Sequence, residues 1–343
     1  MELSLPLNRL TNNEIESLNM LFLARFAPEK GQAPPSTNTK GGVFPIYHYE
    51  LYKAIKSLGL KVTPCNDFAK FLKIAQQFNY IFTVFNRAPM RNPEIFISSM
   101  CEYLEIPYLG APPNLRALAE DKYLTKALAR SLNIPTLPGW TFRDPENIQA
   151  PNNFSGPYFI KPRFGAASEE ISDESIQDKW DGTLPKIVEM LKKGKECLVE
   201  QYMLGTDVTV PVLGGNPPLI LPCAEEISPS HHGVATQKDK RFQQADKGRQ
   251  RKILEDQSII AKANEYISRL WNHVMPFDYL RVDFKLSKDR QELFLMEINI
   301  ACCLWSRSSI PQSASHINIS HADVINHIIS HSLRRQTESM KVV

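Results

Sequence analysis

The sequence contains no long apolar run. None of its uninterrupted apolar segments reaches the roughly 18 residues that a membrane-spanning helix needs. The N-terminal segment, MELSLPLNRLTNNEIE, has neither the basic start nor the apolar stretch of a secretory signal. We therefore expect a soluble, cytoplasmic protein without a membrane partner.

Cysteine and histidine patterns that mark metal sites are also lacking. The six cysteines include no CxxC pair and have no regular spacing, which favours reduced residues of an intracellular protein. His321, His327 and His331 are irregularly spaced and form no HExxH motif, so we interpret them as structural or exposed. The formal net charge is only +3, so the total charge does not indicate a nucleic-acid partner.

The chain of 343 residues is long enough for two or three subdomains, and its first third alternates predicted strands with predicted helices. Strands are expected at 19–27, 61–64, 80–85 and 107–109, with helices at 45–58 and 95–104. This alternation predicts an open parallel sheet, in which ligands bind beyond the carboxyl ends of the strands.

Asn86, Arg87 and Arg91 follow directly after a predicted strand. Their position makes them candidate substrate-binding residues that hold an anion. The alternative is that they are surface residues on a loop, and the sequence alone does not decide between the two.

A helix at 114–134 and a Pro- and Asn-rich connection lead into a second unit. Its first strand, 158–160, delivers Lys161 into the loop KPRFGAAS. Small residues there let backbone N–H groups approach phosphates while Lys161 supplies charge, although an ordinary hairpin turn explains the same residues. A helix from about 185 to 193 and strands at 198–202 and 208–213 are expected next.

The segment EEISPSHHGVATQKDKRFQQADKGRQRK is polar and strongly basic. A nucleic-acid patch is one interpretation, but few aromatic residues are interleaved and no RNA or DNA motif surrounds it. A loop that closes on polyphosphate fits its position between Lys161 and the hairpin described next. For the charges beyond Lys240 a solvated loop is the simpler interpretation.

The most informative stretch is 279–311. Two predicted strands, 280–286 and 293–300, flank the polar turn SKDRQE, which predicts an antiparallel hairpin centred near Arg290.

This hairpin places Asp283 opposite Glu297 and Arg281 opposite Asn299. Because side chains alternate along a strand, all four project from one face. Two carboxylates and an amide oxygen suit Mg²⁺, and the arginine can hold an anion or a developing oxyanion. Either carboxylate alone is better explained as a solvated position, but an ionised Glu297 in a largely apolar strand needs a partner.

Four motifs now stand in chain order: EDK with KPRFG, then EQYMLGTDVTV, RVDF and MEIN. Together they resemble the ATP-grasp superfamily, most closely its D-alanine-D-alanine ligase branch, over residues 107–311. The resemblance implies an α/β (α+β) ATP-grasp fold in three parts, with ATP between the last two. The three parts are an N-terminal open parallel sheet domain at 1–112, a small central subdomain at 113–205 and a C-terminal subdomain with the magnesium site at 206–343.

The resemblance also implies roles for single residues. Lys122 and Lys161 would contact the ATP phosphates, Glu200 the adenine amino group and Asp207 the ribose, with a hinge whose backbone reads the adenine ring. The implied cofactor-binding set is Lys122, Lys161, Glu200, Tyr202, Met203, Asp207 and Lys238. The implied catalytic set is Arg281, Lys161 and Lys240, and the implied Mg²⁺ ligands are Asp283, Glu297 and Asn299. Which of Lys238 and Lys240 contacts phosphate stays open.

Departures from D-alanine-D-alanine ligases fall in the substrate pockets. Where the branch has a Gly-rich, Glu-containing turn, this chain has FAPEKGQAPPSTNTKGG. Where the branch has an HGxxGE-like turn, this chain has FNRAPMRNPE. A Pro-Gly pair of the branch is replaced by Cys302-Cys303. Ser308 lies where the branch holds the carboxylate of the second amino acid, while Trp305 and Arg307 add bulk and charge. With the arginines at 87 and 91, Arg307 suits a carboxylate-bearing substrate larger than alanine.

This profile resembles the D-Ala-D-Ala ligase-like enzymes of mycosporine-like amino acid biosynthesis, which join threonine or serine to mycosporine-glycine with ATP. The implied function is an ADP-forming carbon-nitrogen ligase that uses ATP and Mg²⁺. The alternatives are a D-Ala-D-Ala or other dipeptide ligase and a non-catalytic nucleotide-binding module. The expected partners are an amino acid and a carboxylate-bearing co-substrate, without nucleic acid, and a homodimer is the candidate assembly.

Overall fold

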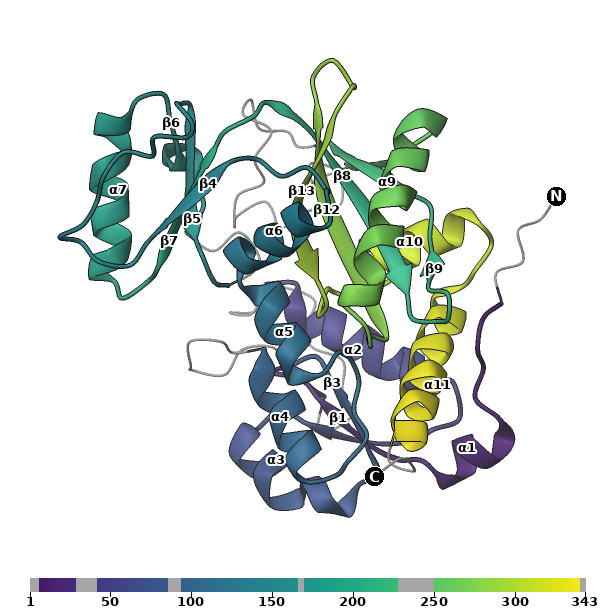
Figure 1. The fold of residues 1–343 in the computed structure, drawn as a ribbon. Helices are drawn as coiled ribbons and strands as arrows, with labels where there is room; N and C mark the ends of the chain where they lie inside the picture. The colour runs from purple at the N-terminus through teal and green to yellow at the C-terminus, as the bar shows by residue number, and fades with distance from the viewer. Residues whose placement is uncertain (1–5, 29–41, 86–93, 166–169, 228–249, 340–343) are drawn as a thin grey trace.

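The computed structural model describes residues 6–28, 42–85, 94–165, 170–227 and 250–339. They form three β-sheets with helices packed around them (Figure 1). Among these residues no helix is both long and apolar enough to cross a membrane.

The first sheet is parallel and has the order β2-β1-β3. Its strands are β1 (Asn19–Leu23), β2 (Lys61–Cys65) and β3 (Tyr80–Thr83). The predicted open parallel sheet is confirmed. The strand expected at 107–109 is reduced to a single bridge between Tyr108 and Ile81.

Helices cover both faces of this sheet, because β3 is buried along its whole length and β1 at every residue after Asn19. Phe22 and Phe82 share a core with α2 (Phe44–Lys56) and α11 (His321–Ser339), whereas Leu21 and Ile81 face α3 (Phe68–Ile74) and α4 (Ile95–Tyr103). The short elements α1 (Asn12–Ser17) and η1 (Ala75–Gln77) complete this part.

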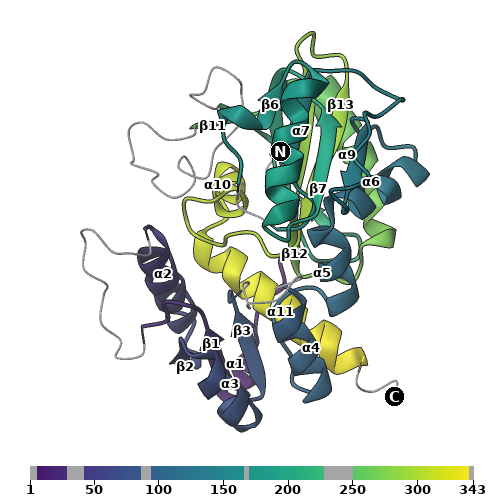
Figure 2. The same cartoon turned by 90° about the vertical axis from the view of Figure 1, so that its left-hand side faces the viewer.

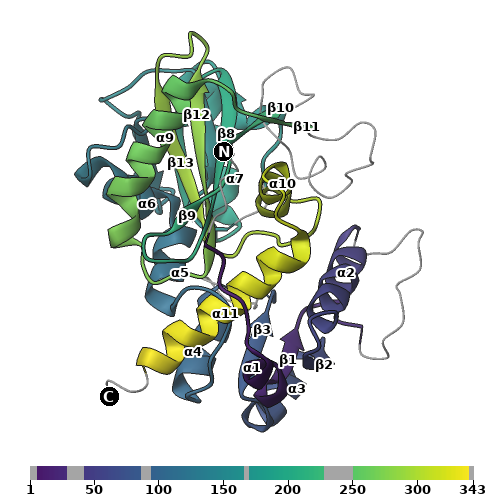
Figure 3. The ribbon, with the colours of Figure 1, turned by 90° about the vertical axis from the view of Figure 1, so that its right-hand side faces the viewer.

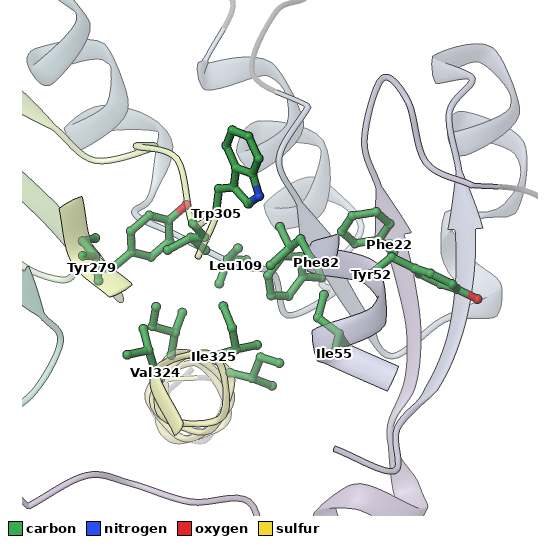
Figure 4. Close-up of a cluster of buried hydrophobic side chains, with 14 of the residues drawn as sticks. Phe22, Tyr52, Ile55, Phe82, Leu109, Tyr279, Trp305, Val324 and Ile325 are labelled. Atoms are coloured by element: carbon green, nitrogen blue, oxygen red, sulfur yellow. The ribbon is translucent and has the colours of Figure 1, made fainter. Parts of the chain in front are cut away.

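The C-terminal helix α11 returns to the N-terminal sheet. Val324 and Ile325 of α11 lie in the same apolar cluster as Phe82 of β3, with Tyr279 and Trp305 from the C-terminal part beside them (Figure 4). Figures 2 and 3 show α11 running between the N-terminal sheet and the largest sheet. The chain is therefore held together by a core to which both of its ends contribute.

The second sheet is antiparallel, with the order β4-β7-β5-β6. Its elements are β4 (Gly139–Phe142), β5 (Tyr158–Pro162), η2 (Asp173–Ser175), β6 (Ile176–Gln177), α7 (Trp180–Lys192) and β7 (Cys197–Gln201). The expected start of α7 at 185 is wrong: the helix begins at Trp180 and Pro185 lies inside it. Proline favours the first turn of a helix, which explains the misplaced start.

The third and largest sheet has the order β11-β10-β8-β12-β13, with β9 paired to β8. Its strands are β8 (Gly205–Leu213), β9 (Leu219–Ile220), β10 (Ala224–Ile227), β11 (Gln250–Ile253), β12 (Tyr279–Ser287) and β13 (Leu293–Asn299). The helices of this part are α9 (Gln257–Leu270), η3 (Trp271–His273) and α10 (Ser309–His316). The predicted hairpin is confirmed in both strands and in its register, with a β-bulge after Asp283.

Two helices, α5 (Pro113–Glu120) and α6 (Lys122–Ser131), precede the second sheet in the chain. Leu115 of α5 and Ala129 of α6 nevertheless pack in the core of the third sheet with α9. The domain limits at 112 and 205 remain predictions. The packing shows that α6 touches the third sheet while its first turn faces the second.

Candidate active site

One face of the third sheet is apolar and the other is polar, because side chains alternate along β8 and β12. Val282, Phe284 and Leu286 point into the core beneath α9. The residues between them, Arg281 and Asp283, lie on the opposite face, where side chains from β13 join them.

Asp283 is the centre of a hydrogen-bonded group on this polar face. Arg281 donates to it twice, from Nε at 2.8 Å and from Nη2 at 2.6 Å, and Thr209 of β8 donates its hydroxyl at 2.6 Å. Asn299 donates from Nδ2 to Asp283 at 3.0 Å and to Glu297 at 3.2 Å. The four residues predicted to share a face therefore do so.

This donor set fits a hard divalent cation. The side-chain N–H groups of Asn299 lie between the carboxylates of Asp283 and Glu297, at the place where a cation would be held. Rotation of the Asn299 side-chain amide by half a turn would present its oxygen to the cation instead. Burial raises the pKa of Asp283, and the nearby Glu297 raises it further, against the effect of Arg281. Positive charge between the two carboxylates would relieve that repulsion. The site contains only two carboxylates, and no group of three or more His, Cys, Asp or Glu ligands exists among the described residues.

Buried lysines surround Glu200 on β7. Lys161 of β5 lies 2.5 Å from one carboxylate oxygen, and Lys126 of α6 contacts the other. Burial lowers the pKa of Lys126 to about 8 and also lowers that of Lys122. Burial alone would raise the pKa of Glu200, but Lys126 and Lys161 outweigh it and hold the carboxyl below its ordinary value. Glu200 was expected to receive an adenine amino group, and in this structure it forms ion pairs with the ammonium groups of Lys126 and Lys161.

A second ion pair fixes where these lysines lie. Asp121 caps α6 by accepting hydrogen bonds from the backbone N–H groups of Tyr123 and Leu124. Its carboxylate also accepts two hydrogen bonds from Arg163, from Nε at 2.9 Å and from Nη2 at 2.6 Å. Lys122 donates its ammonium to the carbonyl of Gly165, just after β5. The start of α6 is thus tied to the end of β5, which brings the lysines of both elements together.

The segment between β7 and β8 connects the second sheet to the third. Tyr202 donates its backbone N–H to Pro157 at 2.7 Å, and its ring lies edge-on to Phe159. Asp207, two residues into β8, pairs with Lys285 of β12. Tyr202 and Met203 therefore lie in a connection between two sheets, as a hinge requires.

The loop after β13 is held by its own hydrogen bonds. The hydroxyl of Ser308 lies 2.6 Å from the carbonyls of both Cys303 and Trp305. The guanidinium of Arg307 lies 5.2 Å from the ring centre of Trp305. Burial raises the pKa of Cys302 to about 12, which makes it an inert thiol and favours packing over catalysis.

Comparisons with known proteins identify the family of this chain. The family model described as D-ala D-ala ligase C-terminus matches residues 129–330. The chain belongs to that family. It is therefore an ATP-dependent ligase of the ATP-grasp type, and the ligase class expected from the sequence is confirmed.

Relatives and solved structures agree with this family. D-alanine–D-alanine ligases of Clostridium botulinum, from strains Okra and Hall, are 29% identical over 243 residues, which covers 69% of this chain and 76% of theirs. The crystal structure of D-alanine–D-alanine ligase from Bacillus anthracis complexed with ATP superposes with a TM-score of 0.71 at 15% identity. It covers 94% of this chain and 100% of that chain, which confirms the expected fold.

In this ligase, five of the predicted site residues lie outside the described residues: Asn86, Arg87, Arg91, Lys238 and Lys240. They stay predictions, as do the roles assigned to the others.

Three site residues were missed, and two of them stand at a spacing that could have revealed them. Lys126 follows Lys122 by four positions, which places both on one face of a helix. Lys285 follows Asp283 by two positions on a strand, and so shares the polar face. Arg163 had no such signal, because its partner Asp121 is 42 residues away.

Proposed function

We propose that this ligase uses ATP and Mg²⁺ to phosphorylate a substrate oxygen and then joins the amine of an amino acid to the activated carbon. The observation that carries this proposal is the polar face around Asp283, which has carboxylates for a metal next to Arg281. Lys122, Lys126 and Lys161 supply positive charge on neighbouring elements. Phosphoryl transfer depends mainly on positioning and charge, and these residues provide both.

The residues divide the work in two steps. Asp283, Glu297 and Asn299 would hold Mg²⁺, which, when bound, neutralises phosphate charge. Lys122 and Lys161 orient the γ-phosphate toward the substrate oxygen, whose bond to phosphorus forms as ADP leaves. The amine then attacks the activated carbon, phosphate departs and the amine loses a proton. Arg281 stabilises the negative charge that develops on oxygen in this second step.

The specific substrates we propose are an amino acid such as threonine or serine and mycosporine-glycine, whose ring oxygen would be phosphorylated. The bulk of Trp305 and the charge of Arg307 after β13 support a carboxylate-bearing substrate larger than alanine. A dipeptide ligase is the second candidate, because the relatives named above are D-alanine–D-alanine ligases.

A substrate screen separates these candidates. Purified protein is incubated with ATP, Mg²⁺, single amino acids and carboxylate-bearing co-substrates, and products are identified by mass spectrometry. We expect ADP release that requires both an amino acid and mycosporine-glycine. Brisk turnover with D-alanine alone would exclude the mycosporine proposal in favour of the dipeptide ligase.

The metal assignment is tested with Glu297→Gln. This variant should fold but lose ADP release, because it removes one of two carboxylates. Glu292→Gln, at the exposed end of the same hairpin, is the matched control and should retain activity. Unchanged ADP release in Glu297→Gln refutes the metal site.

A further inference from the structure

Arg251 belongs to the basic segment of the sequence, but it is not a solvated charge. Its side chain is only 17% exposed, and its Nε lies 2.5 Å from the carboxylate of Glu226, whose side chain is 5% exposed. The sequence favoured a solvated loop for the charges beyond Lys240, and that interpretation is wrong for Arg251. Taking two charges out of water is costly, so a pair this buried calls for a reason.

The position of the pair follows from strand register. Arg251 of β11 lies directly opposite Glu226 of β10, and Glu226 lies opposite Asp207 of β8. Opposed residues project from one face of a sheet, and Asp283 shares that face, because its opposite residue Thr209 is two positions from Asp207. Since β11 is the edge strand, Arg251 can reach from this polar face to the elements beside the sheet.

Beside the sheet, Arg251 holds the start of α10. Its Nη1 donates to the carbonyl of Arg307 at 2.8 Å and to Oε1 of Gln312 at 2.7 Å. Arg307 is in the loop after β13, and Gln312 is in α10. One guanidinium therefore joins β10, this loop and α10, which its planar set of donors allows and a single ammonium does not.

The loop after β13 depends on contacts of this kind. Ser308 is the N-cap residue of α10, but its hydroxyl contacts the carbonyls of Cys303 and Trp305 and does not cap the helix. Burial raises the pKa of the Cys303 thiol, and the charge of Arg251 is among those that lower it, so the guanidinium lies near this part of the loop too.

We propose that Arg251 is a positioning residue for the co-substrate, because it holds the loop after β13 in the shape that places Arg307 and Ser308 for a carboxylate. This inference rests on the proposed function. The lysines proposed to contact ATP lie on other elements, α6 and β5. Loss of the Arg251 contacts should therefore weaken binding of the co-substrate and leave the affinity for ATP unchanged.

The first test measures the loop itself and needs no substrate. Cys303 in that loop is half-buried, whereas the other five cysteines are buried. Its rate of alkylation by iodoacetamide, located by mass spectrometry, reports how often the loop opens. Arg251→Lys keeps the charge beside Glu226 but cannot hold the two acceptors in the same way. It should raise the alkylation rate roughly tenfold, as expected for the loss of one or two hydrogen bonds.

The second test separates the affinities for the two kinds of ligand. With the substrate pair found in the screen above, Arg251→Lys should raise the KM of the carboxylate-bearing co-substrate roughly tenfold. The dissociation constant of ATP with Mg²⁺, measured by calorimetry, should stay at the wild-type value. Gln312→Ala removes one acceptor at an exposed position and should have a smaller effect of the same kind. Arg290→Lys is the matched control, because Arg290 pairs with Glu225 on β10 but is 42% exposed.

Thermal unfolding verifies that each variant is folded, and if Arg251→Lys is not, Gln312→Ala decides by the same criteria. A wild-type alkylation rate or a wild-type KM in the folded variant overturns the inference. Equal weakening of ATP and co-substrate also overturns it, because that result indicates a general loss of structure. If the wild type turns over no substrate pair, the proposed function fails, and the alkylation rates still decide whether Arg251 holds the loop.

Discussion

Trp305, in the loop after β13, donates its indole N–H to Glu50 on α2, 255 residues earlier in the chain. Two further contacts join the same elements: the backbone N–H of Leu304 donates to the Tyr47 hydroxyl at 3.1 Å, and Ser306 lies 3.4 Å from Glu50. The N-terminal part therefore holds the loop that follows β13.

Glu50→Ala is expected to loosen this loop. Loss of a hydrogen bond to a charged acceptor should cost about 1–2 kcal/mol of unfolding free energy, since Glu50 is only half-buried. Once a substrate is known, its KM should rise while the KM for ATP stays constant. Glu50→Gln keeps an acceptor oxygen and should restore most of both values. Equal KM values for substrate in Glu50→Ala and the wild type would show that the contact does not position the loop.

Glu200→Gln is expected to be strongly destabilising. It leaves the buried ammonium groups of Lys126 and Lys161 without their carboxylate, which typically costs about 3–5 kcal/mol. Lys126→Met should cost less, because Glu200 keeps Lys161. Urea unfolding measures both, and the exposed Glu189→Gln, whose pair with Lys193 is worth at most about 1 kcal/mol, is the control.

The double variant Glu200→Gln/Lys126→Met tests whether the charges are coupled. It should be more stable than the sum of the two single effects predicts, because removing Lys126 removes one uncompensated charge. Strict additivity would contradict a shared charge cluster.

The sequence predicted local features of this ligase better than distant ones. The hairpin and the shared face of Asp283 and Glu297 follow from a period of two and one polar turn, which are local properties. The contacts of Glu200 with Lys126 and of Trp305 with Glu50 depend on how separate elements pack. No pattern within one segment contains that information.

Asp121→Ala should detach the start of α6 from the end of β5. Asp121 combines a helix cap with a buried, two-armed pair to Arg163. The cap contributes about 1 kcal/mol and loss of the buried pair about 3–5 kcal/mol more. Asp256→Ala is the matched control, because Asp256 caps α9 in the same way but is only half-buried, and its other partner is the exposed Arg290 at 3.7 Å. Similar losses of unfolding free energy in the two variants would mean that the Arg163 pair contributes little.

Two buried histidines should make the folded state sensitive to acid. Burial lowers the pKa of His48 and of His327 from 6.5 to about 4. Each accepts a backbone N–H at Nδ1, His48 from Phe26 and His327 from Asn8, and His327 also contacts the Gly214 carbonyl through Nε2. Both are therefore neutral when folded, whereas the unfolded chain takes up protons below pH 6.5.

Stability should consequently be complete above pH 6.5 and fall as the pH drops toward 4. At pH 5 each histidine should remove about 2 kcal/mol, because the unfolded state binds more protons than the folded one. Urea unfolding of His327→Gln between pH 4 and 7 should show a shallower slope than the wild type. His273→Gln, a change at an exposed histidine, is the control and should keep the wild-type slope. An unchanged slope in His327→Gln would mean that His327 does not titrate differently on unfolding, and the acid sensitivity would then have to come from other groups.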